Sequence, residues 1–222
     1  MKTKNKILVL LLSLGLLLAS SCGDSTLIFT ASNTSRSVVL DSNVIITDFQ
    51  ISIREVELKP ETNPHESSKK VTYEGPYVLD LIGSSDPLEQ VLDDSAIEPD
   101  TYRLIRFNLH KNKSVTSEHP LYMRSIYIAG TINGTNFTMW HDADENFDIT
   151  NSGGITIDGS ESIVVRFHLH SFLNAEVSLN LSTADATDNI IEINPYSSSS
   201  INRDLARDLK RNIKASADFF KD

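Results

Sequence analysis

The dipeptide Asn133-Gly134 constrains the fold of this chain more than any other feature, because it separates two segments rich in β-forming residues. Asn-Gly favours a two-residue type I′ turn, in which both residues have positive φ. The segments 126–132 and 135–141 are therefore predicted to pair as an antiparallel hairpin. A two-residue loop also sets the register, so Tyr127 is expected opposite Trp140.

This register divides the hairpin into two faces. The apolar face is expected to lie on the core and carries Ile126, Ile128, Gly130, Phe137 and Met139. The opposite face carries Tyr127, Thr131, Asn136, Thr138 and Trp140. Aromatic rings beside hydroxyl and amide groups are typical of a surface that binds a saccharide, so these five residues are the candidate ligand-binding site. The alternative is that the C-terminal helix or another segment covers the aromatic pair.

Other short segments are also predicted to be strands, and in one of them Phe49, Ile51 and Ile53 alternate with polar residues, which is the period of a half-buried strand. The predicted segments are 27–29 (a short edge strand), 38–58, 77–82, 102–110, 155–157, 162–170, 176–181 and 189–194. The apolar phase changes between Ile53 and Val56, which predicts a β-bulge. Glu98-Pro99-Asp100 is a turn signal between strands, and 88–92 has the spacing of a short helical turn. Asp158-Gly159 is predicted to be a second hairpin turn of the same kind as Asn133-Gly134, between 155–157 and 162–170. Short strands with closely spaced turns predict an all-β protein, an antiparallel β-sandwich.

The C-terminal segment has a different period. Residues 201–220 contain no proline or glycine, and one stripe is apolar: Leu205, Leu209, Ile213, Ala217 and Phe220. This pattern predicts an amphipathic helix, which Ser199 or Ser200 can cap. We expect the stripe to pack on the sheet. A partner-binding helix and a membrane-surface helix are the alternatives.

The N-terminus has the layout of a secretory signal. Three lysines precede the apolar run 7–18, and small residues lead to Cys22, the only cysteine. The run is too short to cross a bilayer, which needs about 20 residues. Cys22 stands where a lipoprotein signal peptidase leaves a lipid-modified terminus, although Ala19 occupies the place where leucine is usual. Ordinary cleavage after Ser21, with a free thiol at Cys22, is the alternative.

The predicted organisation is a signal peptide at 1–21, a lipidated cysteine and tether at 22–37, a β-sandwich domain at 38–196 and the helix at 197–222. The full chain has 20 Lys and Arg against 30 Asp and Glu. The signal carries three lysines and no acid, so its removal leaves 17 against 30, a formal charge of −13. Such a charge repels phosphates and excludes nucleic acid as a partner. A single cysteine allows no intramolecular disulfide, so the fold depends on its core.

A set of motifs over about residues 38–195 resembles a family of bacterial envelope lipoproteins of unknown function. They are 45–49 (IITDF), 55–58 (EVEL), 77–81 (YVLDL), 98–107 (EPDTYRLIRF), the hairpin from Gly130-Thr131 to Phe137, and 165–169 (VRFHL). Asp100 and His168 depart from the pattern, in which glycine and an acidic residue are commoner. The resemblance implies a carbohydrate-binding-like, transthyretin-like β-sandwich at the cell envelope and carries over no catalytic residue.

Two patterns could hold a metal ion. Asp142, Asp144, Asn146 and Asp148 alternate like the ligands of a calcium loop, but Phe147 occupies the turn-glycine position and Gly153 the position of the bidentate glutamate. A solvated acidic loop is the alternative. His168 and His170 share one face of a predicted strand and could begin a zinc site with His110 or His141. Arg166 on that face opposes a cation, and exposed strand histidines are the alternative.

The function predicted from sequence is non-catalytic binding of a glycan or an envelope protein by a lipid-anchored bacterial protein. Its expected place is the outer membrane, with the domain periplasmic or surface-exposed. No nucleophile motif or phosphate loop is present, so no catalytic residue and no cofactor are predicted. The alternatives are a fimbria-like structural or assembly subunit, and a metal-dependent hydrolase that uses His168 and His170.

Overall fold

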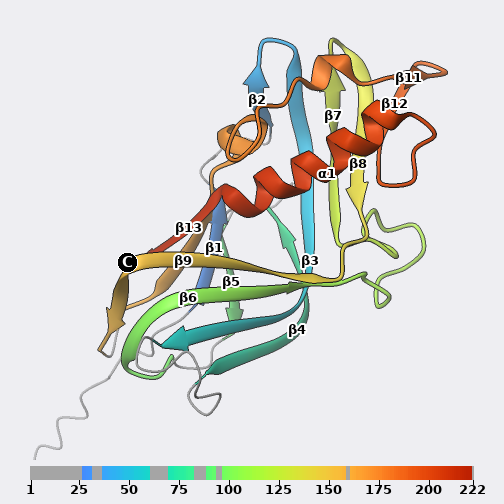
Figure 1. Ribbon diagram of the computed structural model, residues 1–222. Coiled ribbons are helices and arrows are strands. Elements are labelled where there is room, and N and C mark those ends of the chain that lie inside the picture. Colours follow the sequence, from blue (N-terminus) through green and yellow to red (C-terminus); the bar gives the residue numbers. More distant parts are fainter. Residues whose placement is uncertain are drawn as a thin grey trace, which may run out of the picture.

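The computed structural model describes residues 27–31, 37–60, 70–82, 89–93, 97–158 and 161–221. This part of the chain is mostly β-structure with one α-helix near its C-terminus (Figure 1). The strands before the central hairpin are β1 (Leu27–Ala31), β2 (Val38–Asp41), β3 (Val44–Pro60), β4 (Val71–Asp80), β5 (Glu89–Asp93) and β6 (Asp100–Leu109). The later elements are β7 (Ile126–Ile132), β8 (Thr135–His141), β9 (Glu145–Ile157), β10 (Ile163–Phe167), η2 (Leu169–Leu173), η3 (Leu181–Thr183), β11 (Ala186–Thr187), β12 (Ile190–Ile193), α1 (Ser200–Ala215) and β13 (Ala217–Lys221).

The strands form two sheets. The four-stranded sheet has the order β13-β10-β1-β5, and the nine-stranded sheet has the order β11-β12-β8-β7-β3-β6-β9, with β2 and β4 also paired to β3. Most pairs are antiparallel, but β1 pairs with β10 and β12 pairs with β8 in parallel. The predicted β-rich class is therefore confirmed, and the expectation of antiparallel pairing throughout is wrong at these two pairs.

The long strand β3 connects the two halves of the larger sheet, because its partners change along its length. Its first half pairs with β7 and its second half pairs with β6. The register against both β4 and β6 shifts between Ile53 and Glu55. This shift confirms the bulge predicted from the apolar phase change, and it keeps both Ile53 and Val56 buried.

The β7–β8 hairpin has the predicted register, with Tyr127 opposite Trp140. Asn133 and Gly134 have φ of 52° and 77°, as a type I′ turn requires. Glycine is required at position 130, because a Cβ there would collide with the backbone carbonyl of Ile45 on β3. The residues predicted for the core face of the hairpin are all buried.

The two sheets share one core. Phe147 of the larger sheet meets Phe167 of the smaller one edge to face, with ring centroids 6.5 Å apart. Leu27 is fully buried in the same cluster, and β1 lies between β10 and β5. The expectation that residues 27–29 form an edge strand is therefore wrong, and the predicted tether 22–37 contains an internal strand.

Three other local predictions are also wrong. Residues 89–93 form β5 rather than a helical turn, because they pair with β1. Strands β9 and β10 on either side of Asp158 belong to different sheets, so this turn makes no hairpin. Residues 176–180 are irregular, and a 3-10 turn follows them. In each case contacts distant in sequence decide the structure of a short segment whose local pattern is ambiguous.

The helix α1 begins after Ser199, whose hydroxyl accepts a hydrogen bond from the backbone N–H of Asn202 (3.2 Å). Its apolar stripe of Leu205, Leu209 and Ile213 is buried in the core cluster, as expected. The helix ends at Ala215, and the rest of the predicted helix forms β13 against β10. The described residues contain no helix long and apolar enough to cross a membrane.

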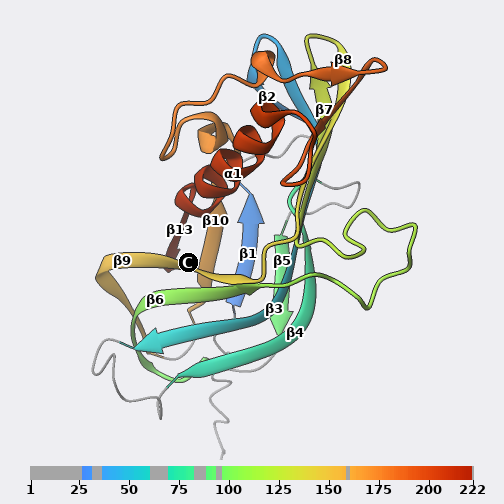
Figure 2. The same cartoon turned by 45° about the vertical axis from the view of Figure 1, so that its right-hand side comes forward.

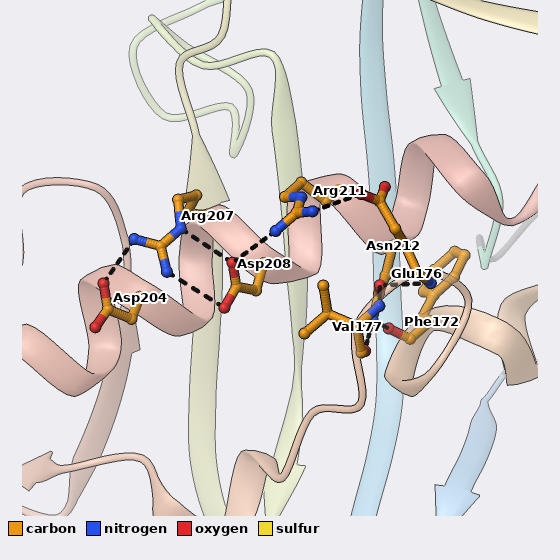
Figure 3. A network of polar contacts seen from close by, with 8 residues as sticks. All are labelled: Phe172, Glu176, Val177, Asp204, Arg207, Asp208, Arg211 and Asn212. Atoms are coloured by element: carbon orange, nitrogen blue, oxygen red, sulfur yellow. Dashed lines mark hydrogen bonds and ion pairs between the residues drawn. The ribbon is translucent and has the colours of Figure 1, made fainter.

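Two buried asparagines of α1 hold the irregular chain before it. The Asn212 side chain is fully buried, and its Oδ1 accepts hydrogen bonds from the backbone N–H groups of Glu176 (3.0 Å) and Val177 (2.8 Å) (Figure 3). Its Nδ2 donates to the carbonyls of Phe172 and Val177, both at 2.7 Å. Asn212 therefore supplies partners for backbone groups of η2 and of the irregular segment that follows it.

The exposed side of the same helix carries ion pairs. Arg207 bonds to Asp204 and Asp208, and Arg211 bonds to Glu176 across to the irregular segment (Figure 3). The Arg211 and Glu176 side chains are each 46% exposed, so water and salt screen their attraction. The buried amide rather than the exposed ion pair is expected to stabilise this docking.

Replacement of Asn212 by alanine tests this ranking. Asn212→Ala leaves buried backbone donors and acceptors without partners, so the free energy of unfolding should fall by about 2–4 kcal/mol. The matched variant Arg211→Ala, one residue away, should lower it by less than about 1 kcal/mol. Urea unfolding of both variants measures the difference, and equal losses would contradict the account.

Candidate functional site

A cavity of about 440 Å³ opens between the β11–β12 hairpin and the start of α1. Both elements are at the right-hand end of the helix in Figure 1. Its lining is mostly polar, with carboxylates and hydroxyls beside two exposed apolar side chains. The lining residues are Asp185, Thr187, Asp188, Ile190, Glu192, Asn194, Tyr196, Ser197, Ser198, Ser199 and Asn202. The volume is within the range of about 300–1,000 Å³ that small-molecule sites occupy.

One wall of the cavity comes from the short β11–β12 hairpin. Asp188 and Asn189 form its two-residue turn with φ of 53° and 61°, a conformation that Asp and Asn tolerate better than most residues. Along β12, Ile191 and Ile193 are buried in the core. The alternate residues Ile190, Glu192 and Asn194 line the cavity instead, as strand alternation requires.

Asn202 joins this wall to the helix. The side chain is 3% exposed, and its Oδ1 accepts a hydrogen bond from the backbone N–H of Asp185 (2.9 Å). Its Nδ2 donates to the carbonyls of Asp185 and Glu192, both at 2.9 Å. The Ser199 hydroxyl donates to the Asp185 carboxylate (2.5 Å). Asn202 thus fixes the backbone at two of the carboxylate positions in the cavity wall.

Tyr196 stands at the mouth of the cavity with 68% of its surface exposed. Its ring packs on Trp140 with centroids 5.8 Å apart, and its hydroxyl donates to Asp142 (2.7 Å). Lys111 forms an ion pair with the same carboxylate (2.6 Å). Partial burial acts to raise the pKa of Asp142, but the hydrogen bonds from Lys111 and Tyr196 outweigh it and hold that pKa below its usual value. Tyr196 is therefore oriented although it is exposed.

The predicted ligand-binding face of the hairpin lies beside this cavity. Its five residues (Tyr127, Thr131, Asn136, Thr138 and Trp140) share the face opposite the core, as the register requires. Trp140 and Tyr127 are only half-buried. The Arg124 guanidinium lies 4.8 Å from the centroid of the Trp140 ring, which also contacts Tyr196. The segment after β12, rather than α1, therefore covers part of Trp140.

This outer face also carries two carboxylates that the sequence reading did not single out. Gln50 lies opposite both Tyr127 and Asp80, and its amide donates to Asp48 (3.1 Å). Burial raises the pKa of Asp48, and the nearby Asp80 raises it further. Burial likewise raises the pKa of Asp80. Figure 2 shows α1 on one side of β7 and β8 and the chain between β6 and β7 on the other, near this face.

Of the four residues predicted as a calcium loop, Asn146 and Asp148 lie on strand β9 and Asp142 and Asp144 precede it, and all four have partners of their own. Asp148 forms a bidentate pair with Arg106 (both bonds 2.7 Å), and Asn146 accepts from Asn108 (2.8 Å). Asp142 bonds to Lys111 and Tyr196, and Asp144 lies 4.0 Å from Arg54. Pairing of β9 with β6 therefore turns the oxygens of Asn146 and Asp148 toward cross-strand partners rather than toward one ion.

The two histidines proposed for zinc do not share a strand face. β10 ends at Phe167, so His168 follows the strand and His170 lies in η2. His168 contacts Asp218 (3.1 Å), whereas His110 lies near Asp144 and His141 near Asp142. Within the described ranges, no group of three or more His, Cys, Asp or Glu residues could hold a metal ion.

Sequence reasoning missed Tyr196, the cavity carboxylates and Asn202. The signal available was an aromatic residue within the polar run that precedes the helix, next to Pro195. Cys22 and the signal segment 1–21 lie outside the described residues.

Comparison of the chain with protein-family models, with curated proteins and with solved structures finds no match.

Proposed function

We propose that this protein is a non-catalytic saccharide-binding module of the bacterial cell envelope, held at the membrane by lipid on Cys22. The observation that carries the binding proposal is the exposed Tyr196 ring at the mouth of a cavity lined by oxygen groups. Burial of an aromatic ring is favourable, so a ring left largely in water beside a polar cavity can gain free energy when a ligand covers it. A saccharide has both an apolar ring face and hydroxyl edges, and it matches this combination.

The details of the cavity support a saccharide over a wholly apolar ligand. Asp188 and Glu192 can accept hydrogen bonds from sugar hydroxyls, and Ile190 offers an apolar surface that is 50% exposed. Trp140 behind Tyr196 extends the aromatic surface toward the predicted hairpin face. The resemblance to carbohydrate-binding-like sandwich domains also supports a saccharide as the ligand. Packing of Phe147 on Phe167 between the sheets supports the sandwich arrangement that the resemblance implies.

A binding assay with the full chain in detergent tests the proposal. Isothermal titration with short neutral oligosaccharides and with short oligosaccharides of amino sugars should detect binding of at least one of these ligands. Tyr196→Ala should weaken it by about tenfold or more, because truncation of an aromatic contact residue typically removes this much affinity. Tyr122→Ala, a second exposed tyrosine outside the cavity lining, is the control and should bind like wild type. Binding that is absent, or equal in the two variants, would refute the proposal.

The anchor is the second part of the proposal. Leu27 is already part of a sheet, and the five residue steps from Cys22 to Leu27 span about 18 Å at most. A lipid on Cys22 would therefore hold the β-domain close to the membrane surface. Stable anchoring needs two or more acyl chains, as a lipoprotein terminus provides.

Substitution of the cysteine tests the anchor in cells. The wild-type protein should incorporate labelled palmitate and sediment with the outer membrane, whereas Cys22→Ser should do neither and should retain its signal segment. Labelling that is absent from the wild type, or fractionation that is identical for the two forms, would show ordinary cleavage or another location.

A further inference from the structure

The charge of the cavity identifies a narrower class of ligand. Three carboxylates line it, from Asp185, Asp188 and Glu192. None of the described lining residues is Lys, Arg or His. Within the described part of the chain, none of the three carboxylates forms an ion pair, whereas other carboxylates do, as at Asp142, Asp148 and Glu145.

The start of α1 compensates only part of this charge. Asp185 accepts a hydrogen bond from Ser199, the N-cap residue, where the helix end carries about half a positive charge. Asp188 and Glu192 have no such partner among the described residues, and both are exposed to the cavity and to solvent. A cavity lined by one sign of charge concentrates ligands of the opposite sign.

We infer that the saccharide bound in this cavity carries a protonated amine. This inference rests on the proposed function. The apolar face of such a sugar would stack on Tyr196 and Ile190, and its ammonium group would donate to the free carboxylates of Asp188 and Glu192. Charge-assisted hydrogen bonds of this kind are about twice as strong as neutral ones. Saccharides that carry phosphate or carboxylate groups are excluded, because like charges would meet in the cavity.

The test compares two short oligomers that differ only in this group. Glucosamine trisaccharide and its fully N-acetylated form are titrated into the full chain in detergent at the same salt concentration. The free amine form should bind about tenfold more tightly or better, since one charge-assisted hydrogen bond is worth about this factor.

Carboxamide variants locate the effect. Asp188→Asn and Glu192→Gln should each weaken binding of the amine oligomer by about tenfold and leave any binding of the acetylated oligomer unchanged. Asn tolerates the positive φ at position 188, so the turn is retained. Glu74→Gln is the matched control. It removes the same charge from an exposed position on β4, outside the cavity lining, and should bind like wild type.

The outcomes separate the two proposals. Equal binding of both oligomers, with carboxamide variants like wild type, would overturn the amine inference and leave saccharide binding intact. If Glu74→Gln lost as much affinity as Asp188→Asn, the net charge of the protein rather than the cavity would attract the ligand, and the amine inference would again be overturned. If calcium chloride alone bound to the wild type but to neither carboxamide variant, the cavity would be a cation site and the amine inference would be overturned. Failure of every saccharide, with Tyr196→Ala indistinguishable from wild type, would defeat the proposed function itself.

Discussion

The backbone between η2 and β12 depends on two asparagine side chains of α1. This stretch contains little regular structure, so its N–H and C=O groups need partners that neighbouring strands do not provide. Asn212 bonds to the chain at residues 172–177, and Asn202 bonds to it at Asp185 and Glu192. A buried amide is stabilising only when its donor and acceptor positions are filled, and both side chains meet that condition. The helix therefore positions an irregular segment in addition to packing on the core.

The cavity follows from this arrangement. Apolar residues of α1 fix the helix on the core, and Asn202 and Ser199 at its first turn then hold Asp185 and the β11–β12 hairpin beside it. Parallel pairing of β12 with β8 brings the chain after β12 to Trp140, where Tyr196 packs. The aromatic surface and the carboxylate wall thus come from segments that only the tertiary fold brings together.

Local sequence signals predicted the parts of this fold that local interactions determine. Asn133-Gly134 encodes its own turn, so the register of the hairpin and the identity of its outer face could be predicted pair by pair. The change of apolar phase in β3 located the bulge, and the period of the C-terminal segment located α1 and its cap. The end of the helix at Ala215 could not be predicted, because Ala217 and Phe220 continue its apolar stripe in the sequence. Pairing with β10, which is distant in sequence, makes residues 217–221 a strand instead.

The candidate site was predicted only in part, for the same reason. Trp140 was placed correctly on the outer face, but its neighbour Tyr196 comes from a segment whose position depends on a parallel strand pair. The alternating acidic residues near β9 and the histidines near β10 matched metal patterns by spacing alone. Cross-strand partners such as Arg106 for Asp148, and the end of β10 before His168, are not visible in that spacing.

Residue-resolved amide hydrogen exchange tests most directly whether the asparagines hold the irregular segment. The expected result is that the amides of Glu176, Val177 and Asp185, although outside helices and strands, exchange as slowly as those in the middle of α1. Exchange of these three amides at the rate of exposed loops, while α1 remains protected, would contradict it.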